Sequence, residues 1–185
     1  MENKELFEIL EKTVISFGAY RAKVITTDKI ETDSSFRDMC AMNSCGVYGK
    51  CWMCPPDVGD IEQLMSDVKK YSYALVYQMI SELEDSYDFE GMIKAKKNSY
   101  KINKDIRATV EKLSLGKVLY LGAGGCGVCE TCAKHEDQPC RFPELATPSL
   151  EAYGINVSQL AKVSDMKYVN GVNTVTYFSA ILFSV

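Results

Sequence analysis

The sequence predicts an α+β fold with roughly four strands, in a mixed or antiparallel sheet, and about as many helices. First, 185 residues, 46% of them hydrophobic, are enough to bury one core, so residues 1–185 are most simply a single domain. Second, the spacing of apolar residues changes several times along the chain between three or four and two. Third, the C-terminal run VTYFSAILFSV is apolar at successive positions, as a central strand covered on both faces would be.

The N-terminal residues predict one helix and then one strand. Apolar residues recur there at spacings of four, four and three, which places them on one face of a helix that ends near Gly18. These residues are Leu6, Leu10, Val14 and Phe17. The period then changes to two, which predicts a strand with one buried face. The buried set is Tyr20, Ala22 and Val24, and Arg21 and Lys23 alternate with it.

A second helix and strand are predicted after residue 59. Asp60 can cap a helix whose third residue is Gln63. The apolar stripe of this helix is Ile61, Leu64, Val68 and Tyr71. Residues 73–80, YALVYQMI, then predict a buried strand.

The remaining elements begin with a long helix. Its core face is Ile102, Ile106, Val110 and Leu113. Gly116 can end it, and the strand KVLYLG follows. A helix around residues 150–153 and another capped by Asn156, with Gln159 at its third position, precede the final strand.

All eight cysteines fall in two segments of the chain. Residues 40–56 contain the first group, Cys40, Cys45, Cys51 and Cys54. Residues 124–143 contain the second group, Cys126, Cys129, Cys132 and Cys140. Glycine, asparagine, serine and proline are frequent around the first group, which predicts a loop. The second group directly follows a predicted strand.

The charge pattern indicates a cytoplasmic protein. The N-terminus, MENKELFEILEKTV, is charged throughout and lacks the apolar core of a signal peptide, and no segment has the roughly 18 apolar residues of a membrane span. Thiols stay reduced in the cytoplasm, so the cysteines indicate metal ligation or redox chemistry rather than disulfides. A net charge of −4 provides no overall basic field for nucleic acid. We therefore expect neither a nucleic-acid nor a membrane partner.

The second cysteine group has the spacing C-x2-C-x2-C-x7-C. Three cysteines at successive spacings of three can place their thiolates at three corners of an iron–sulfur cube. The run resembles that of bacterial ferredoxins, but seven residues instead of three precede Cys140, and the following proline is displaced to Pro143. Whether Cys140 serves the same cluster or another one stays open at this point.

The first cysteine group has the less regular spacing C-x4-C-x5-C-x2-C-P. A proline directly after Cys54 is a ferredoxin-like feature. Four thiolates are enough for a second cube, so two [4Fe-4S] clusters would account for every cysteine. Zinc is the alternative cofactor, because two C-x2-C pairs are typical of a tetrahedral thiolate site. A triple run, however, leaves one cysteine of the second group without a partner pair.

The chain also resembles a known family at four stretches. These are FGAYRAKVI, CGVYGKCWMCPP, GGCGVCETCAKHEDQPCRFP and TPSLEAYGINV. They are similar to the signatures of a family described only as predicted metal-binding proteins, common in anaerobic bacteria and archaea. The resemblance implies a bound metal and names no reaction.

Other polar and aromatic residues each have more than one reading. A basic ridge on the long helix either docks an acidic redox partner or is a solvated face: Lys94, Lys97, Lys101 and Lys104. His135 either contributes to a metal site or is a solvated loop residue. Trp52 either shields a cluster from water or only packs against neighbouring side chains. Arg141 stabilises an anionic cluster, binds an anionic substrate or pairs with Glu144.

The leading functional hypothesis is a protein with two [4Fe-4S] clusters that passes single electrons to a partner enzyme. All eight cysteines are then cofactor and metal ligands. One alternative is an enzyme in which three cysteines hold a cluster and leave one iron open for substrate or sulfur chemistry. The other is a zinc-stabilised interaction module. The sequence leaves open whether the protein is an enzyme, which partner it serves and its oligomeric state.

Overall fold

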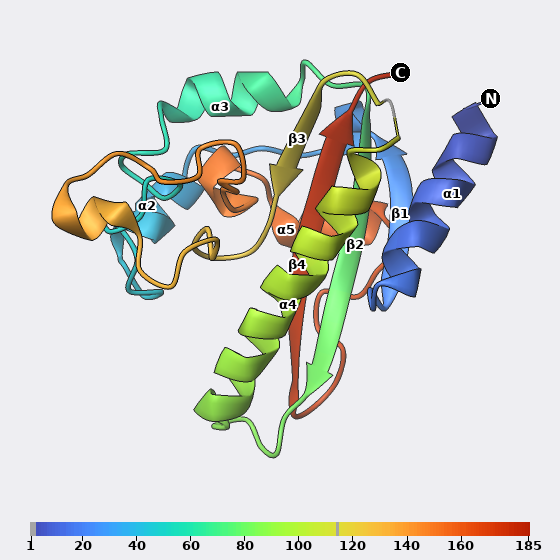
Figure 1. The fold of residues 1–185 in the computed structure, drawn as a ribbon. Helices are drawn as coiled ribbons and strands as arrows, with labels where there is room; N and C mark the ends of the chain where they lie inside the picture. The colour runs from blue at the N-terminus through green and yellow to red at the C-terminus, as the bar shows by residue number, and fades with distance from the viewer. Residues whose placement is uncertain (1–2, 114) are drawn as a thin grey trace.

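Four antiparallel strands form one sheet in the order β1-β2-β4-β3 (Figure 1). The computed structural model describes residues 3–113 and 115–185. The strands are β1 (Arg21–Thr26), β2 (Tyr73–Glu82), β3 (Val118–Leu121) and β4 (Thr174–Phe183). Of the two sheet types that the sequence allows, the antiparallel one is confirmed. The central position of the last strand is confirmed as well, because β4 pairs with β2 on one side and β3 on the other.

Helices cover both faces of this sheet. The α-helices are α1 (Asn3–Ser16), α2 (Phe36–Ala41), α3 (Ile61–Val68), α4 (Phe89–Val110) and α5 (Val157–Val163). Short 3-10 helices are η1 (Thr27–Lys29), η2 (Ala133–Glu136) and η3 (Glu151–Tyr153). No helix in the described ranges combines the length and the apolar character needed to cross a membrane. The combination of these helices with one antiparallel sheet confirms the α+β fold class.

Two predicted caps are present with their expected hydrogen bonds. The Asp60 carboxylate accepts from the Gln63 amide at 3.0 Å and begins α3. The Asn156 side chain accepts from the Gln159 amide at 3.1 Å and begins α5. Each bond satisfies one of the amides that a helix leaves unpaired in its first turn, so the start of both helices follows from local sequence.

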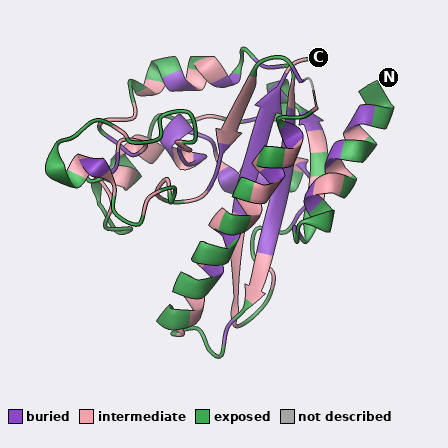
Figure 2. Cartoon of the chain, in the orientation of Figure 1, coloured by how far each residue is buried: buried purple, intermediate pink, exposed green. Residues whose placement is uncertain are grey.

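The two faces of the sheet bury separate apolar clusters. Leu75 and Tyr77 of β2 join α1 and α4 in one cluster, while Ala74 and Val76 join α3 and α5 in the other. Alternate residues of a strand point to opposite faces, so one strand serves both clusters. Figure 2 shows the buried colour running along β2 and β4. This burial on both sides explains why the last strand is apolar at successive positions.

Three expectations for local structure differ from what is observed. Tyr20 is 60% exposed, because β1 begins only at Arg21 and the alternating pattern does not extend back to it. Phe17 lies beyond the end of α1 and is also exposed. The first cysteine segment is not entirely a loop, since Cys40 belongs to the six-residue helix α2. That helix is too short to show an apolar period in the sequence.

Candidate metal centre

The two cysteine segments lie against each other beside the sheet. The first includes the end of α2 and the second follows β3, and both lie on the side of the sheet where α2 is labelled (Figure 1). The indole nitrogen of Trp52 donates to the Gln138 carbonyl at 2.8 Å. Lys134 pairs with Asp57 at 2.8 Å, and its ammonium lies 4.2 Å from the centroid of the Trp52 ring. Residues about 80 positions apart thus form one structural unit.

A third segment, residues 148–154, supports both cysteine segments. Gly122 donates to the Pro148 carbonyl and accepts from the Leu150 amide, each at 2.9 Å, just before the second segment begins. On the other side, the Asp33 amide donates to the Gly154 carbonyl at 2.7 Å. Arg37 of α2 also donates to the Ala152 carbonyl, at 3.3 Å. Hydrogen bonds to residues 148–154 therefore hold the chain just before each of the two cysteine segments.

The cysteines line two neighbouring pockets. The larger, of about 390 Å³, is lined by three of them: Cys40, Cys45 and Cys54. The smaller, of about 40 Å³, is lined by five: Cys51, Cys126, Cys129, Cys132 and Cys140. Cys51 therefore lies with the second group although it belongs to the first segment. When the cysteines are grouped by pocket, they divide into three and five. When they are grouped by segment, they divide into four and four.

Cys51 and Cys54 connect the two pockets and are buried. Cys54 donates its thiol hydrogen to the Cys51 sulfur, and this bond lowers the pKa of Cys51 and raises that of Cys54. Further hydrogen bonds to the Cys51 sulfur come from the amides of Cys126 and Met53 and from the Cys132 thiol, and they also lower the pKa of Cys51. The thiol of Cys51 thus faces the second segment.

Backbone amides point at the sulfur of Cys126 as well. The Thr147 amide donates to Cys126 Sγ at 3.3 Å. Burial raises the pKa of Cys126, while the amides of Thr147 and Val128 oppose that rise. Amide donors to cysteine sulfur stabilise the thiolate form, which is the form that binds metals and whose hydrogen bonding tunes iron–sulfur clusters.

Helix α4 holds the second segment through Tyr100. The Tyr100 hydroxyl donates to the Gly125 carbonyl at 2.8 Å. Gly127 lies flat against the same ring, so that a methyl group at this position would overlap it. Gly127 also has a φ of +70°, which glycine adopts without strain. Burial raises the pKa of Tyr100, and the charge of the nearby Cys126 adds to that rise. The phenol therefore stays protonated and remains a hydrogen-bond donor.

The three-cysteine pocket contains one acidic side chain. Glu151 of η3 lines it together with Ser149 and Asn156. Burial raises the pKa of this carboxyl group. Burial also raises the pKa of Cys40, and Glu151 adds to that rise by its charge. A carboxylate and three thiols thus border the same space.

The donor set fits a thiolate-bound metal, although the geometry is not that of a single-ion site. All eight cysteines are free thiols. Within the described residues, no group of three or more His, Cys, Asp or Glu side chains is placed to hold one metal ion. An iron–sulfur cube binds each thiolate to a different iron, so its ligands are farther apart than those of one ion.

Several residues of the centre were not found from the sequence. Tyr100, Thr147 and Glu151 carry no motif, since each reaches the cysteines through folding. Arg141 donates to the Thr131 carbonyl at 2.9 Å and lies 3.5 Å from Glu136, so the one of its three readings that paired it with Glu144 is wrong. His135 is exposed and lines neither cysteine pocket, which places it among the solvated loop residues.

Comparisons with known proteins agree with a metal site. The model of a family described as predicted metal-binding protein (DUF2284) matches residues 23–183, which include every cysteine. Searches of curated proteins and of solved structures returned no match. With its match running from β1 to the end of β4, the chain belongs to the DUF2284 family of predicted metal-binding proteins.

Proposed function

We propose that this protein is an iron–sulfur protein with two [4Fe-4S] centres that transfers single electrons to a partner enzyme. The observation that carries the proposal is the gathering of eight thiols from two docked segments around two adjoining pockets. Amides already point at the sulfurs of Cys51 and Cys126. A metal that binds four thiolates there would also fix the two segments to each other.

The second cysteine group supports a fully coordinated cluster. Cys126, Cys129, Cys132 and Cys140 line one pocket, which favours Cys140 as the fourth ligand of the same cluster. Cys51 lines that pocket too, so five thiols are present where four are needed. Cys51 then either replaces one of the four or lies between the clusters.

Electron transfer by such centres needs a donor and an acceptor. We propose that each cluster takes one electron from a low-potential one-electron carrier protein and releases it to the oxidised partner enzyme, with no bond formed or broken. Exposed lysines of α4 favour an acidic carrier, because opposite charge speeds encounter. The exposed set is Lys94, Lys97, Lys101 and Lys104.

A second candidate function comes from the three-cysteine pocket. Three thiolates can hold a cluster with one iron open, and the pocket of about 390 Å³ would be shared by that cluster and a small ligand. Glu151 borders that space and is the carboxylate available to the fourth iron. In this arrangement the open iron would bind substrate or sulfur as a Lewis acid, as in an enzyme.

Anaerobic purification with metal analysis tests the proposal. Two cubes require about eight iron and eight acid-labile sulfide per chain. Stoichiometric zinc without sulfide, in protein made with ample iron and no oxygen, would replace the proposal with a zinc-stabilised interaction module. Adding cyanide to the reduced protein separates the two iron–sulfur candidates, because only an open iron changes its electron paramagnetic resonance spectrum.

A further inference from the structure

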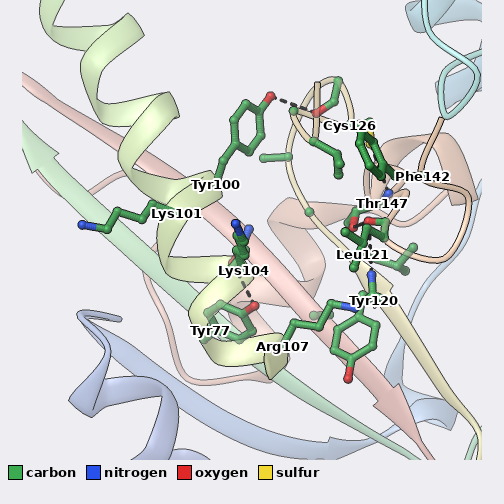
Figure 3. A pocket seen from close by; sticks show the side chains of 18 residues that line it. Tyr77, Tyr100, Lys101, Lys104, Arg107, Tyr120, Leu121, Cys126, Phe142 and Thr147 are labelled. Atoms are coloured by element: carbon green, nitrogen blue, oxygen red, sulfur yellow. Dashed lines mark hydrogen bonds between the residues drawn. The ribbon is translucent and has the colours of Figure 1, made fainter. Parts of the chain in front are cut away.

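A cavity of about 520 Å³ lies between α4, β3 and the second cysteine segment (Figure 3). It is separate from the three-cysteine pocket and shares Cys126, Gly127, Val128 and Phe142 with the small five-cysteine pocket. Its volume falls within the range of about 300 to 1,000 Å³ typical of small-molecule sites. The proposed electron transfer makes no use of this space.

The charged groups that line the cavity are all cationic. They are Lys101, Lys104 and Arg107, and no Asp or Glu lines it among the described residues. Arg107 is already engaged, since it pairs with Glu111 at 2.8 Å and donates to the carbonyls of Glu144 and Leu145. Lys104 makes no hydrogen bond or ion pair within residues 3–113 and 115–185 and lies three residues before Arg107 on α4, whereas Figure 3 shows Lys101 extending away from the cavity. Lys104 is therefore the cation available to a ligand.

The walls of the cavity are largely aromatic and aliphatic. Tyr100 and Phe142 border it near Cys126, and Tyr77 and Tyr120 border it near Arg107 (Figure 3). Three apolar side chains that line the cavity are each more than a third exposed: Val128, Phe142 and Leu145. Clustered exposed apolar side chains around a cavity are typical of a binding site.

We propose that this cavity binds a small organic carboxylate with a planar apolar body. The carboxylate pairs with Lys104 at the end of the cavity near Arg107. The apolar body lies between Tyr100 and Phe142, toward Cys126. This orientation keeps the negative charge of the ligand away from the anionic thiolate centre and places its body beside that centre.

Two features of the site support a carboxylate over a neutral ligand. Tyr77 donates to Asn103 at 2.8 Å, and Asn103 donates to Ser179 at 3.0 Å, so these polar groups of the cavity floor already satisfy one another. The ammonium of Lys104 and the buried hydroxyl of Tyr120, which has no hydrogen-bond partner among the described residues, are then the donors left for a ligand. A carboxylate gives the ammonium a charge-assisted hydrogen bond, which is about twice as strong as one between neutral groups.

Calorimetric titration of the metal-loaded protein under nitrogen tests the inference. The probes are benzoate and 2-naphthoate, with benzamide and 2-naphthamide as neutral controls of the same shape. We expect the acids to bind with dissociation constants below about 10 mM and the amides to bind at least tenfold more weakly, as loss of one charge-assisted bond predicts.

Two pairs of variants locate the binding. Lys104→Gln should weaken acid binding about tenfold, while Lys97→Gln, an exposed lysine of α4 outside the cavity, should leave it unchanged. Leu145→Trp should fill the cavity and abolish binding, and Val172→Trp, at a position 87% exposed, is its control. Urea unfolding verifies that each variant is folded.

Three results would overturn the inference: neither acid binds below about 10 mM, the amides bind as well as the acids, or Lys104→Gln binds the acids as the unchanged protein does. Calorimetry reads binding directly, and iron and sulfide are measured on the same sample. If the protein holds zinc and still binds the acids through Lys104, the proposed function is refuted and the carboxylate site is supported.

Discussion

The hydroxyl of Tyr100 donates a 2.8 Å hydrogen bond to the carbonyl of Gly125, and through it α4 holds the chain one residue before Cys126. We expect Tyr100→Phe to lower the free energy of unfolding by about 1 kcal/mol, the usual value of one such bond. It should also speed the loss of metal to a chelator, because the segment that carries Cys126 is less restrained. Urea unfolding and chelator kinetics measure the two effects.

Tyr177→Phe is the matched control for that variant. Its hydroxyl donates to the Met92 carbonyl at 3.2 Å, also on α4 but away from the cysteines. A similar loss of stability with an unchanged rate of metal loss is the expected result. Equal chelator kinetics in the two variants would mean that Tyr100 supports the fold and not the centre.

Gly127 should tolerate no side chain. Gly127→Ala adds a methyl group against the Tyr100 ring, and Gly124→Ala, at the same φ of +70°, meets the flexible end of Lys96 and the Tyr100 hydroxyl at ordinary contact distances. Both variants carry the backbone cost of about 1 to 2 kcal/mol for this conformation. We expect Gly127→Ala to lose a further 1 to 3 kcal/mol or so from overpacking and to bind less metal. Coincident urea transitions for the two variants would contradict this account.

Cys51 should affect both centres, because its sulfur lies next to the thiols of Cys54 and Cys132. We expect Cys51→Ser to change the electron paramagnetic resonance signals of both reduced clusters. Cys45→Ser should change one signal and Cys129→Ser the other, since these residues line different pockets. If Cys51→Ser altered only the signal that Cys45→Ser alters, the division into three and five would be wrong.

The ion pair between Lys134 and Asp57 should contribute measurably to stability, because each side chain is less than a fifth exposed. A double-mutant cycle with Lys134→Met and Asp57→Asn should give a coupling energy of about 1 to 3 kcal/mol. The same cycle on the exposed pair Glu8 and Lys12 should give about 0.3 to 0.5 kcal/mol. Equal coupling energies for the two pairs, measured by urea unfolding, would contradict this expectation and would show that the docked segments exchange with an open form.

Local signals in the sequence predict much of the fold. Asp60 and Asn156 begin helices with the expected side-chain bonds, and the successive apolar residues of β4 correctly indicate a strand covered on both faces. Such features depend on residues a few positions apart or on the period of one element. Tyr20 was wrongly assigned to the buried face of β1, and α2 was missed. In both cases too few residues are present to define a period, since Tyr20 lies at a strand end and α2 has six residues.

The candidate site is less accessible to sequence reasoning. Spacing alone groups Cys51 with its neighbours in the chain, whereas its thiol faces Cys132, more than 80 residues away. That placement depends on how Trp52 and Lys134 dock the two segments. The cavity at Lys104 is formed by α4, by strands β2, β3 and β4 and by the second cysteine segment, so no motif marks it.

The position of β4 between β2 and β3 bears on when the metal can enter. The ribosome makes every cysteine before it makes β4, and β3 pairs with β4 alone among the strands described, so the edge from which the second cysteine segment starts has no partner until then. During synthesis the thiols are therefore carried by a chain whose sheet is incomplete. The strand from which the second cysteine segment starts therefore joins the sheet only after β4 has been made, and until then the nascent thiols are open to oxidants and to competing metal ions.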